Sequence, residues 1–205
     1  MSPAQLNRAA IERAAAVIRG GELVAIPTDT VYGLAADPFQ EPAVRKIFRL
    51  KGRPENKPIL LLVESVRQVE LLASKLPDAF ERLAARFWPG ALTMILPAGP
   101  GVPVWITAGT ETVAVRLPGS VLTRELIRAA RAPLTGTSAN RSGRPAAQSA
   151  EQVRQQFPAG LALILDGGPA RSRWPSTLVD LTDEPRVLRE GAIRAADVLF
   201  LGQTA

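Results

Sequence analysis

The sequence contains no cysteine and no histidine among its 205 residues. Without cysteine the chain has no disulfide framework, no thiol nucleophile and no cysteine-based zinc site. Without histidine it has no Ser-His-Asp or Cys-His catalysis, no H-E-x-x-H metal helix, and not the most common general base. An enzyme of this composition would work by cationic stabilisation and positioning, with Mg²⁺ held through substrate phosphates.

Long apolar runs and several familiar motifs are also missing. No run approaches the roughly 20 apolar residues of a membrane span. Arg8, Glu12 and Arg13 interrupt the N-terminal segment, where a signal peptide would need an apolar stretch. The chain has neither a G-x-x-x-x-G-K-[ST] nor a G-x-G-x-x-G motif, so a nucleotide would not bind as in P-loop or Rossmann proteins. We therefore expect a cytoplasmic protein with no membrane partner.

The composition that remains is basic and rich enough in apolar residues to form a core. Hydrophobic residues make up 46% of the chain, its net charge is +6, and its pI is about 10.7. A basic balance fits an RNA, nucleotide or other anionic partner, although an arginine bias can equally reflect codon usage. No repeat, low-complexity tract or linker divides the sequence. We expect a single domain over residues 1–205.

Apolar runs of strand length alternate with helical patterns along the chain. Helix starts are predicted from capping patterns at Ser2/Gln5, Ser65/Gln68, Asp78/Glu81 and Ser149/Gln152. This alternation predicts an α/β domain, and a closing hairpin around Asp183-Glu184 makes its twisted, helix-flanked β-sheet mixed. The predicted strands are 23–26, 59–63, 92–96, 112–117, 134–138, 161–165, 177–181 and 186–188.

A short basic segment, Lys51–Pro58, follows the helix that Pro42 opens. Its glycine and two prolines keep it out of a helix interior and a central strand, and it holds Lys51, Arg53 and Lys57. Arginine forks onto phosphate oxygens and lysine acts as a mobile point charge, so the segment suits a phosphate chain. The alternative is a solvated basic turn.

Other polar residues lie where ligands gather in α/β sheets, at the ends of predicted strands. These are Thr28–Thr30, Ser138–Asn140 and Ser176–Thr177. The first two can also be simple turns, and the single tyrosine, Tyr32, can belong to the core. Thr112 and Arg116 have even spacing and face the same side of their strand, where Arg116 either binds an anion or forms a structural ion pair.

Six short motifs occur together and in order: Pro27-Thr-Asp-Thr-Val-Tyr-Gly-Leu34, Lys51-Gly-Arg53-Pro, Arg116-Leu-Pro118, Ser138-Ala-Asn140-x-Ser-Gly143, Ser176-Thr177 and Leu188-Arg189. In this combination the chain resembles the YrdC/Sua5/TsaC family, the threonylcarbamoyl-AMP synthases. The resemblance implies a YrdC-like fold with a concave, basic cavity. It also implies a nucleotidyltransferase that converts L-threonine, bicarbonate and ATP into threonylcarbamoyl-AMP and pyrophosphate. This is the first step of t6A modification at tRNA position 37, and a downstream threonylcarbamoyl transferase complex takes the product.

The resemblance assigns site residues by position. The catalytic signature falls on Lys51, Arg53, Ser138 and Asn140; the ATP contacts fall on Arg53, Lys57, Thr112, Ser138 and Arg189; the threonine contacts fall on Thr30, Arg116 and Ser176. Leu62 stands where longer relatives can have a polar threonine contact, and Lys57 stands where asparagine is frequent. No metal ligand is identified, and Mg²⁺ is expected to bind through ATP phosphates and water. The chain looks like the short form of the family.

Two other functions remain open at this point. A non-catalytic double-stranded RNA or tRNA-binding module would use the +6 charge, but an aromatic content of 5% offers little base stacking. A carbamoyl transferase of another pathway is the second, because this domain also occurs inside hydrogenase-maturation proteins. That context brings a zinc finger, which a chain without cysteine cannot form.

Overall fold

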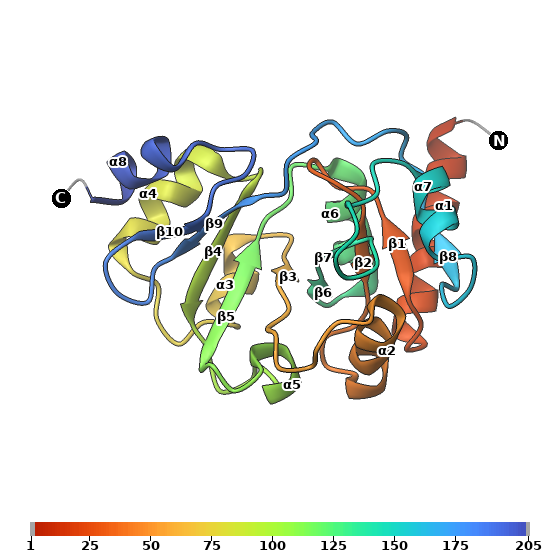
Figure 1. The fold of residues 1–205 in the computed structure, drawn as a ribbon, viewed down its shortest axis with the longest axis horizontal. Coiled ribbons are helices and arrows are strands. Elements are labelled where there is room, and N and C mark those ends of the chain that lie inside the picture. The colour runs from red at the N-terminus through yellow and green to blue at the C-terminus, as the bar shows by residue number, and fades with distance from the viewer. Residues whose placement is uncertain (1–2, 204–205) are drawn as a thin grey trace.

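The computed structural model describes the backbone of residues 3–203 and the side chains of residues 8–203. Two β-sheets stand side by side, and helices cover their outer faces (Figure 1). The helices are α1 Pro3–Arg19, α2 Glu41–Lys51, α3 Val66–Glu70, α4 Asp78–Phe87, α5 Val104–Thr107, α6 Val121–Ala130, α7 Ala150–Gln156 and α8 Ala195–Gln203. The strands are β1 Val24–Ile26, β2 Gly33–Ala35, β3 Leu61–Leu62, β4 Leu92–Pro97, β5 Thr112–Arg116, β6 Leu134–Thr135, β7 Thr137–Ser138, β8 Leu163–Ile164, β9 Thr177–Asp180 and β10 Arg186–Arg189.

Both sheets are mixed. The smaller has the order β7-β2-β1-β8, with β1 antiparallel to β2 and parallel to β8. The larger has the order β10-β9-β4-β5-β3-β6 and includes the β9–β10 hairpin that was expected from the sequence. In Figure 1 the smaller sheet and α1 lie in the right half, α4, α8 and strands β10, β9, β4 and β5 of the larger sheet lie in the left half, and the edge strand β6 lies next to β7. The predicted mixed α/β fold is confirmed, with two sheets in place of the one expected.

The residue at which the chain passes from one sheet to the other is Gly136. The run 134–138 was expected to be one strand, but β6 pairs with β3 in the larger sheet and β7 pairs with β2 in the smaller. A Cβ atom at Gly136 would lie 2.7 Å from Leu62 Cγ, so only glycine fits this crossing without movement of a buried neighbour. The crossing delivers Ser138 directly into the space between the sheets.

The helix caps follow the sequence in two of the three described cases. The Ser65 and Ser149 side chains accept hydrogen bonds from the backbone N–H groups three residues later. Asp78 was expected as a cap, but Pro77 occupies that position and Asp78 is the first helical residue, where its carboxylate faces the positive end of the helix dipole. The fourth expected cap, Ser2, lies outside the described residues.

Apolar side chains from both sheets contribute to one large buried cluster, which includes Leu34 of β2, Leu61 of β3 and Leu92 of β4. A second cluster joins α1 and α6 behind the smaller sheet. Within residues 3–203 no helix is long and apolar enough to span a membrane.

Candidate functional site

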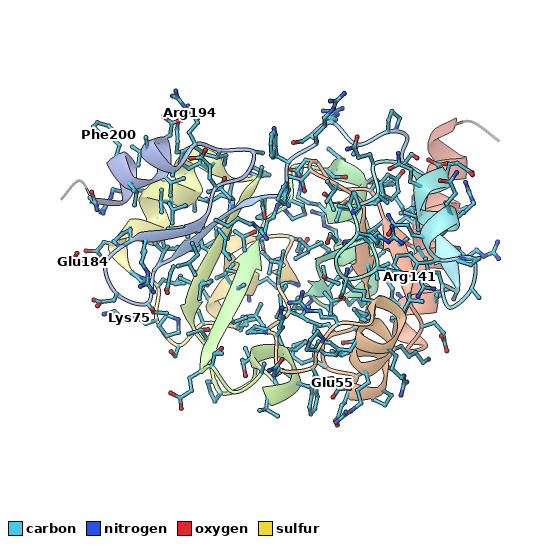
Figure 2. The ribbon with its side chains drawn as sticks, in the orientation of Figure 1. Glu55, Lys75, Arg141, Glu184, Arg194 and Phe200 are labelled. Carbon is cyan, nitrogen blue, oxygen red and sulfur yellow. The ribbon has the colours of Figure 1, made fainter. Side chains whose placement is uncertain are left out.

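A cavity of about 380 Å³ lies between the two sheets. Its lining includes Thr30, Arg53, Arg116, Ser138, Ser176 and Arg189, six of the residues to which the sequence assigned a role. Thr30 precedes β2, Arg53 follows α2 and Ser176 precedes β9, whereas Arg116, Ser138 and Arg189 end β5, β7 and β10. By contrast, charged side chains such as Lys75, Glu184 and Arg194 point outward at the edge of the molecule (Figure 2).

Arg116 is the most buried charge in this cavity, with 3% of its surface exposed. Its Nε donates to the Gly90 carbonyl at 2.9 Å, and its Nη1 donates to Thr30 Oγ1 at 2.9 Å. Its Nη2 lies 2.7 Å from Asp29 Oδ1, although that nitrogen has no aligned hydrogen-bond acceptor in the described part of the chain. Burial lowers the pKa of Arg116 and Asp29 opposes this effect, so the ion pair favours its charged form.

The segment Thr28–Thr30 is therefore both a turn and a part of the site. Thr28 Oγ1 accepts a hydrogen bond from the Thr30 N–H at 3.1 Å, as expected of a threonine turn. Asp29, to which no role beyond this turn was assigned from the sequence, pairs with Arg116 and accepts from the Gly119 N–H at 2.9 Å. The ion pair that was one of two alternatives for Arg116 is present, and the same guanidinium lines the cavity.

Two further arginines border the cavity without a carboxylate partner among the described residues. Arg53 donates from Nη2 to the Pro58 carbonyl at 2.9 Å, and its buried Nε has no acceptor there. Arg189 donates to the Ser176 carbonyl at 2.9 Å and stands at a bulge in β10, which redirects side chains locally. Burial lowers the pKa of both guanidinium groups, which marks them as cations that an anionic ligand would stabilise.

Two hydroxyl groups in the lining of the cavity form a hydrogen-bonded pair. Ser176 Oγ and Thr93 Oγ1 are 2.7 Å apart, and both side chains are almost completely buried. Thr93 belongs to β4, whose register with β9 places it beside Leu178, the second residue after Ser176. The sequence analysis missed Thr93 because a single threonine in an apolar strand is typical of core packing.

Lys51 does not lie in the basic loop but ends helix α2, where it is 4% exposed. Its ammonium donates to the carbonyls of Ser138 and Asn140, the latter at 2.8 Å, and lies 3.4 Å from Asn140 Oδ1. Burial, together with the nearby charge of Arg53, lowers the pKa of Lys51 to about 8. Lys51 thus holds the Ser138–Asn140 loop, in which Ser138 Oγ donates to Asn140 Oδ1 at 2.5 Å.

Besides Lys51, three of the predicted site residues do not line the cavity. Lys57 is exposed on the loop after α2. Thr112 stands at the start of β5, two residues before the lining residue Ala114, and its hydroxyl is 2.9 Å from Thr110 Oγ1. The Asn140 amide donates to the carbonyls of Arg141 and Arg144, so this side chain supports its own loop.

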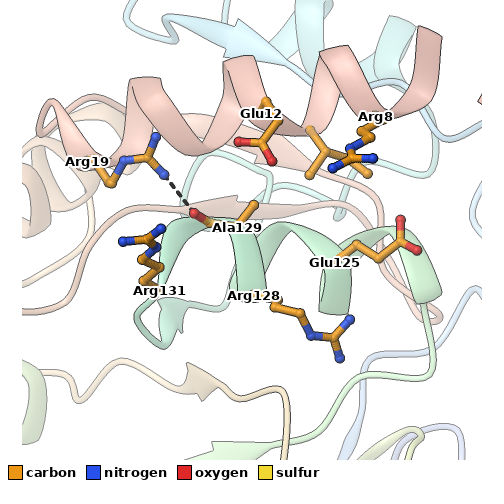
Figure 3. Close-up of a pocket in the computed structure, with 8 residues that line it drawn as sticks. Arg8, Glu12, Arg19, Glu125, Arg128, Ala129 and Arg131 are labelled. Atoms are coloured by element: carbon orange, nitrogen blue, oxygen red, sulfur yellow. Dashed lines mark hydrogen bonds between the residues drawn. The ribbon is translucent and has the colours of Figure 1, made fainter. Parts of the chain in front are cut away.

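A larger hollow of about 920 Å³ lies on the surface between α1 and α6. Figure 3 shows Arg8, Glu12 and Arg19 on α1, Glu125 and Arg128 on α6, and Arg131 directly after α6 around it. All six charged side chains are exposed, and they are four arginines and two glutamates. Arg19 donates to the Ala129 carbonyl at 2.7 Å and Arg128 pairs with Glu64 at 3.0 Å, so this exposed groove lacks the convergent buried donors of the inter-sheet cavity.

The inter-sheet cavity has no carboxylate in its lining, and the described residues contain no cluster of three or more acidic side chains that could hold a metal ion. Mg²⁺ prefers carboxylate and phosphate oxygens, so the residues present do not fit a metal ion held by the protein itself. The arrangement of three arginines and several hydroxyl groups instead fits an anionic, hydroxyl-bearing ligand.

The fold and this cavity define an α/β protein that presents buried cations to a ligand between two sheets. Residues 16–191 match the Sua5/YciO/YrdC family, described under the heading "Telomere recombination". The chain belongs to this family. It is 44% identical over 189 residues to the threonylcarbamoyl-AMP synthase of Pyrococcus abyssi and 42% identical over 189 residues to that of Bacillus subtilis.

The alignments cover 92% and 91% of this chain but 56% and 55% of those two proteins, so the chain spans about half the length of these curated relatives. A putative threonylcarbamoyl-AMP synthase of Mycobacterium tuberculosis is 39% identical over 201 residues, with 96% of this chain and 92% of that protein covered. Among solved structures, P. abyssi Sua5 complexed with L-threonine superposes with a TM-score of 0.90 at 43% identity, covering 93% of this chain and 56% of that one.

Proposed function

We propose that this chain is a threonylcarbamoyl-AMP synthase, which converts L-threonine, bicarbonate and ATP into threonylcarbamoyl-AMP and pyrophosphate. One observation carries the proposal: three arginines, Arg53, Arg116 and Arg189, border the same cavity, and the buried Nε of Arg53 has no acceptor among the described residues. Buried donors of this kind are costly unless a ligand supplies acceptors. The names of the relatives and the L-threonine complex of P. abyssi Sua5 support this choice of ligand.

The chemistry requires charge neutralisation more than it requires a base. The threonine nitrogen forms a bond to the bicarbonate carbon, water leaves, and a carbamate anion results. A carbamate oxygen then forms a bond to the α-phosphorus of ATP, the bond from that phosphorus to the bridging oxygen breaks, and pyrophosphate leaves. Two anions must meet in line, and fixed guanidinium groups in a partly desolvated cavity reduce their repulsion. This accounts for an enzyme without histidine or cysteine.

Each cluster of side chains has a place in this scheme. We assign Arg116, Thr30 and Ser176, which line the cavity, to the threonine carboxylate and hydroxyl, and Arg116 donates to Thr30 Oγ1. Arg53 and Arg189, with Ser138, would meet the triphosphate. Lys51 and Asn140 would act through the loop that carries Ser138, because their polar atoms are bonded within that loop.

The remaining assignments are part of the same proposal. Thr112 and Lys57 would contact ATP beyond the cavity lining, near the start of β5 and on the loop after α2. Mg²⁺ would enter with ATP, held by phosphate oxygens and water, because the lining has no carboxylate. A single domain over residues 1–205 is supported by the buried cluster shared between the sheets. Contact with tRNA, delivery to a threonylcarbamoyl transferase complex and a cytoplasmic location complete the proposal.

The test is to incubate the pure protein with ATP, Mg²⁺, bicarbonate and L-threonine and to look promptly for pyrophosphate and a new adenylate by liquid chromatography and mass spectrometry. We expect pyrophosphate that depends on both L-threonine and bicarbonate. Arg53→Ala should abolish most of it, whereas Arg194→Ala, which removes an arginine whose side chain is 80% exposed, should match the wild type. Absence of product together with tight, salt-sensitive tRNA binding would overturn the proposal in favour of an RNA-binding module.

A further inference from the structure

Tyr32, the single tyrosine, lies at the junction of two segments that carry site residues. It is fully buried in the wall of the inter-sheet cavity. Its backbone N–H donates to the Ala147 carbonyl at 2.9 Å, and its carbonyl accepts from the Ala139 N–H at 2.7 Å. The backbone of Tyr32 therefore supports the Ser138–Asn140 loop.

The hydroxyl of Tyr32 reaches a different part of the chain. It donates to the Gly168 carbonyl at 2.7 Å, accepts from the Gly167 N–H at 3.2 Å and lies 3.4 Å from Asp166 Oδ1. Burial is the largest cause that raises the pKa of this phenol above its usual value, so the hydroxyl keeps its proton at neutral pH. A single buried group thus satisfies two backbone groups at the start of the segment 166–176.

That segment is a bridge between the sheets. It leaves the smaller sheet after β8 and enters the larger sheet at β9, and its last residues, Pro175 and Ser176, line the cavity. Further contacts hold the segment nearer the cavity: the Ala170 N–H donates to the Gln148 carbonyl, and the Pro175 carbonyl accepts from the Ala192 N–H. At its last residue, the Ser176 carbonyl accepts from Arg189 and the Ser176 hydroxyl pairs with Thr93 Oγ1. The contacts of Tyr32 fix the end of the bridge that belongs to the smaller sheet.

We propose that the Tyr32 hydroxyl is a positioning group for the bridge 166–176, which it holds so that Ser176 meets the ligand at the Arg116 end of the cavity. This inference rests on the proposed function for the identity of the ligand, L-threonine. Tyr32 positions the wall through Gly167 and Gly168 and takes no part in bond making.

Tyr32→Phe separates the two roles of this residue. The ring and both backbone hydrogen bonds to the Ser138–Asn140 loop remain, and only the hydroxyl contacts with the bridge are lost. The KM for L-threonine should rise about 3- to 30-fold, as expected for one lost buried hydrogen bond and its unsatisfied partner. The KM for ATP should change by less than about twofold, because Arg53 and Ser138 are held by other contacts.

Hydrogen exchange gives a readout that does not depend on catalysis. In Tyr32→Phe the amides of the bridge 166–176 should exchange faster, while the Ala139 amide, which donates to the backbone carbonyl of Tyr32, should keep its wild-type protection. The matched control is Val198→Ala, which removes buried volume in α8, outside the lining of the cavity. It should lower the melting temperature and leave the KM for L-threonine and the exchange of the bridge unchanged.

The outcomes separate this inference from the proposed function. A lower melting temperature in Tyr32→Phe with wild-type KM values and wild-type exchange of the bridge would overturn the positioning role. If the wild type makes no adenylate, the proposed function fails, and the exchange of the bridge alone decides: faster exchange in Tyr32→Phe than in Val198→Ala supports the positioning role, and equal exchange refutes it.

Discussion

Replacement of Arg116 by lysine tests whether this guanidinium clamps the threonine carboxylate or serves only as a structural ion pair. In the structure its nitrogens reach three separate groups: the Gly90 carbonyl, Thr30 Oγ1 and Asp29 Oδ1. A lysine ammonium can keep the charge pair with Asp29 but cannot span all three groups and a carboxylate as well. Arg116→Lys therefore keeps the charge and removes the planar fork.

The structure sets the expected size of the effect. Arg116→Lys loses two hydrogen bonds from a charged donor, each contributing about 1.5–3 kcal/mol, so the free energy of unfolding should fall by about 3–6 kcal/mol. Loss of bidentate binding to the substrate carboxylate should raise the KM for L-threonine about 100-fold or more, equivalent to about 2.7 kcal/mol. Urea unfolding measures the first quantity, and pyrophosphate release at varied L-threonine measures the second.

Asp29→Asn is the informative companion variant. It leaves the guanidinium in place but removes the carboxylate that competes with a ligand for Arg116. Because Asp29 keeps 17% of its side chain exposed, we expect a loss of stability of about 2–3 kcal/mol, below the value for a fully buried pair. The KM for L-threonine should stay level or fall.

A KM within about twofold of the wild type in Arg116→Lys, at any stability, would refute the clamp.

Three further predictions concern other parts of the site. Lys51 has a pKa of about 8 in place of the usual 10.5, so between these pH values the folded protein binds fewer protons than the unfolded chain, and its stability should rise with pH. The KM for ATP should rise above pH 8, where Lys51 loses its charge. Lys51→Arg should remove this alkaline change in KM. Gly136→Ala should lower the free energy of unfolding by about 1–3 kcal/mol in urea titration, and Leu62→Ala in the same chain should relieve the clash. Ser176→Ala and Thr93→Val should be non-additive in stability, because each removes the same 2.7 Å hydrogen bond; additive effects would show that the pair is not coupled.

Local patterns in the sequence were sufficient to place most helices and strands. The apolar runs at 92–96 and 112–117 became β4 and β5, and Ser65 and Ser149 cap their helices as expected. Such features depend on periodicity and on contacts within a few residues, which a single sequence contains. Strand β2, Gly33–Ala35, was not predicted, because its residues have little intrinsic strand preference and its pairing with β1 and β7 decides its conformation.

Features that depend on long-range pairing could not be read in the same way. Nothing in the run 134–138 indicates that its halves pair with different sheets, since the partners β3 and β2 are set by the tertiary fold. The basic residues show the same limit. Lys51 and Arg53 are two positions apart in a basic motif, yet Lys51 donates to the Ser138–Asn140 loop and Arg53 borders the cavity. The resemblance to a known family supplied residue positions, and the structure supplied their partners.

The central claim, that the cavity joins a carbamate to the α-phosphorus of ATP, is tested most directly by pyrophosphate–ATP exchange. The protein is incubated with ATP, Mg²⁺ and labelled pyrophosphate, with L-threonine and bicarbonate added separately and together, and label incorporated into ATP is measured. Reversible formation of threonylcarbamoyl-AMP predicts label in ATP when both are present and none when either is omitted. Exchange with L-threonine alone would indicate an aminoacyl adenylate, and absence of exchange under all conditions would contradict adenylate formation at this site.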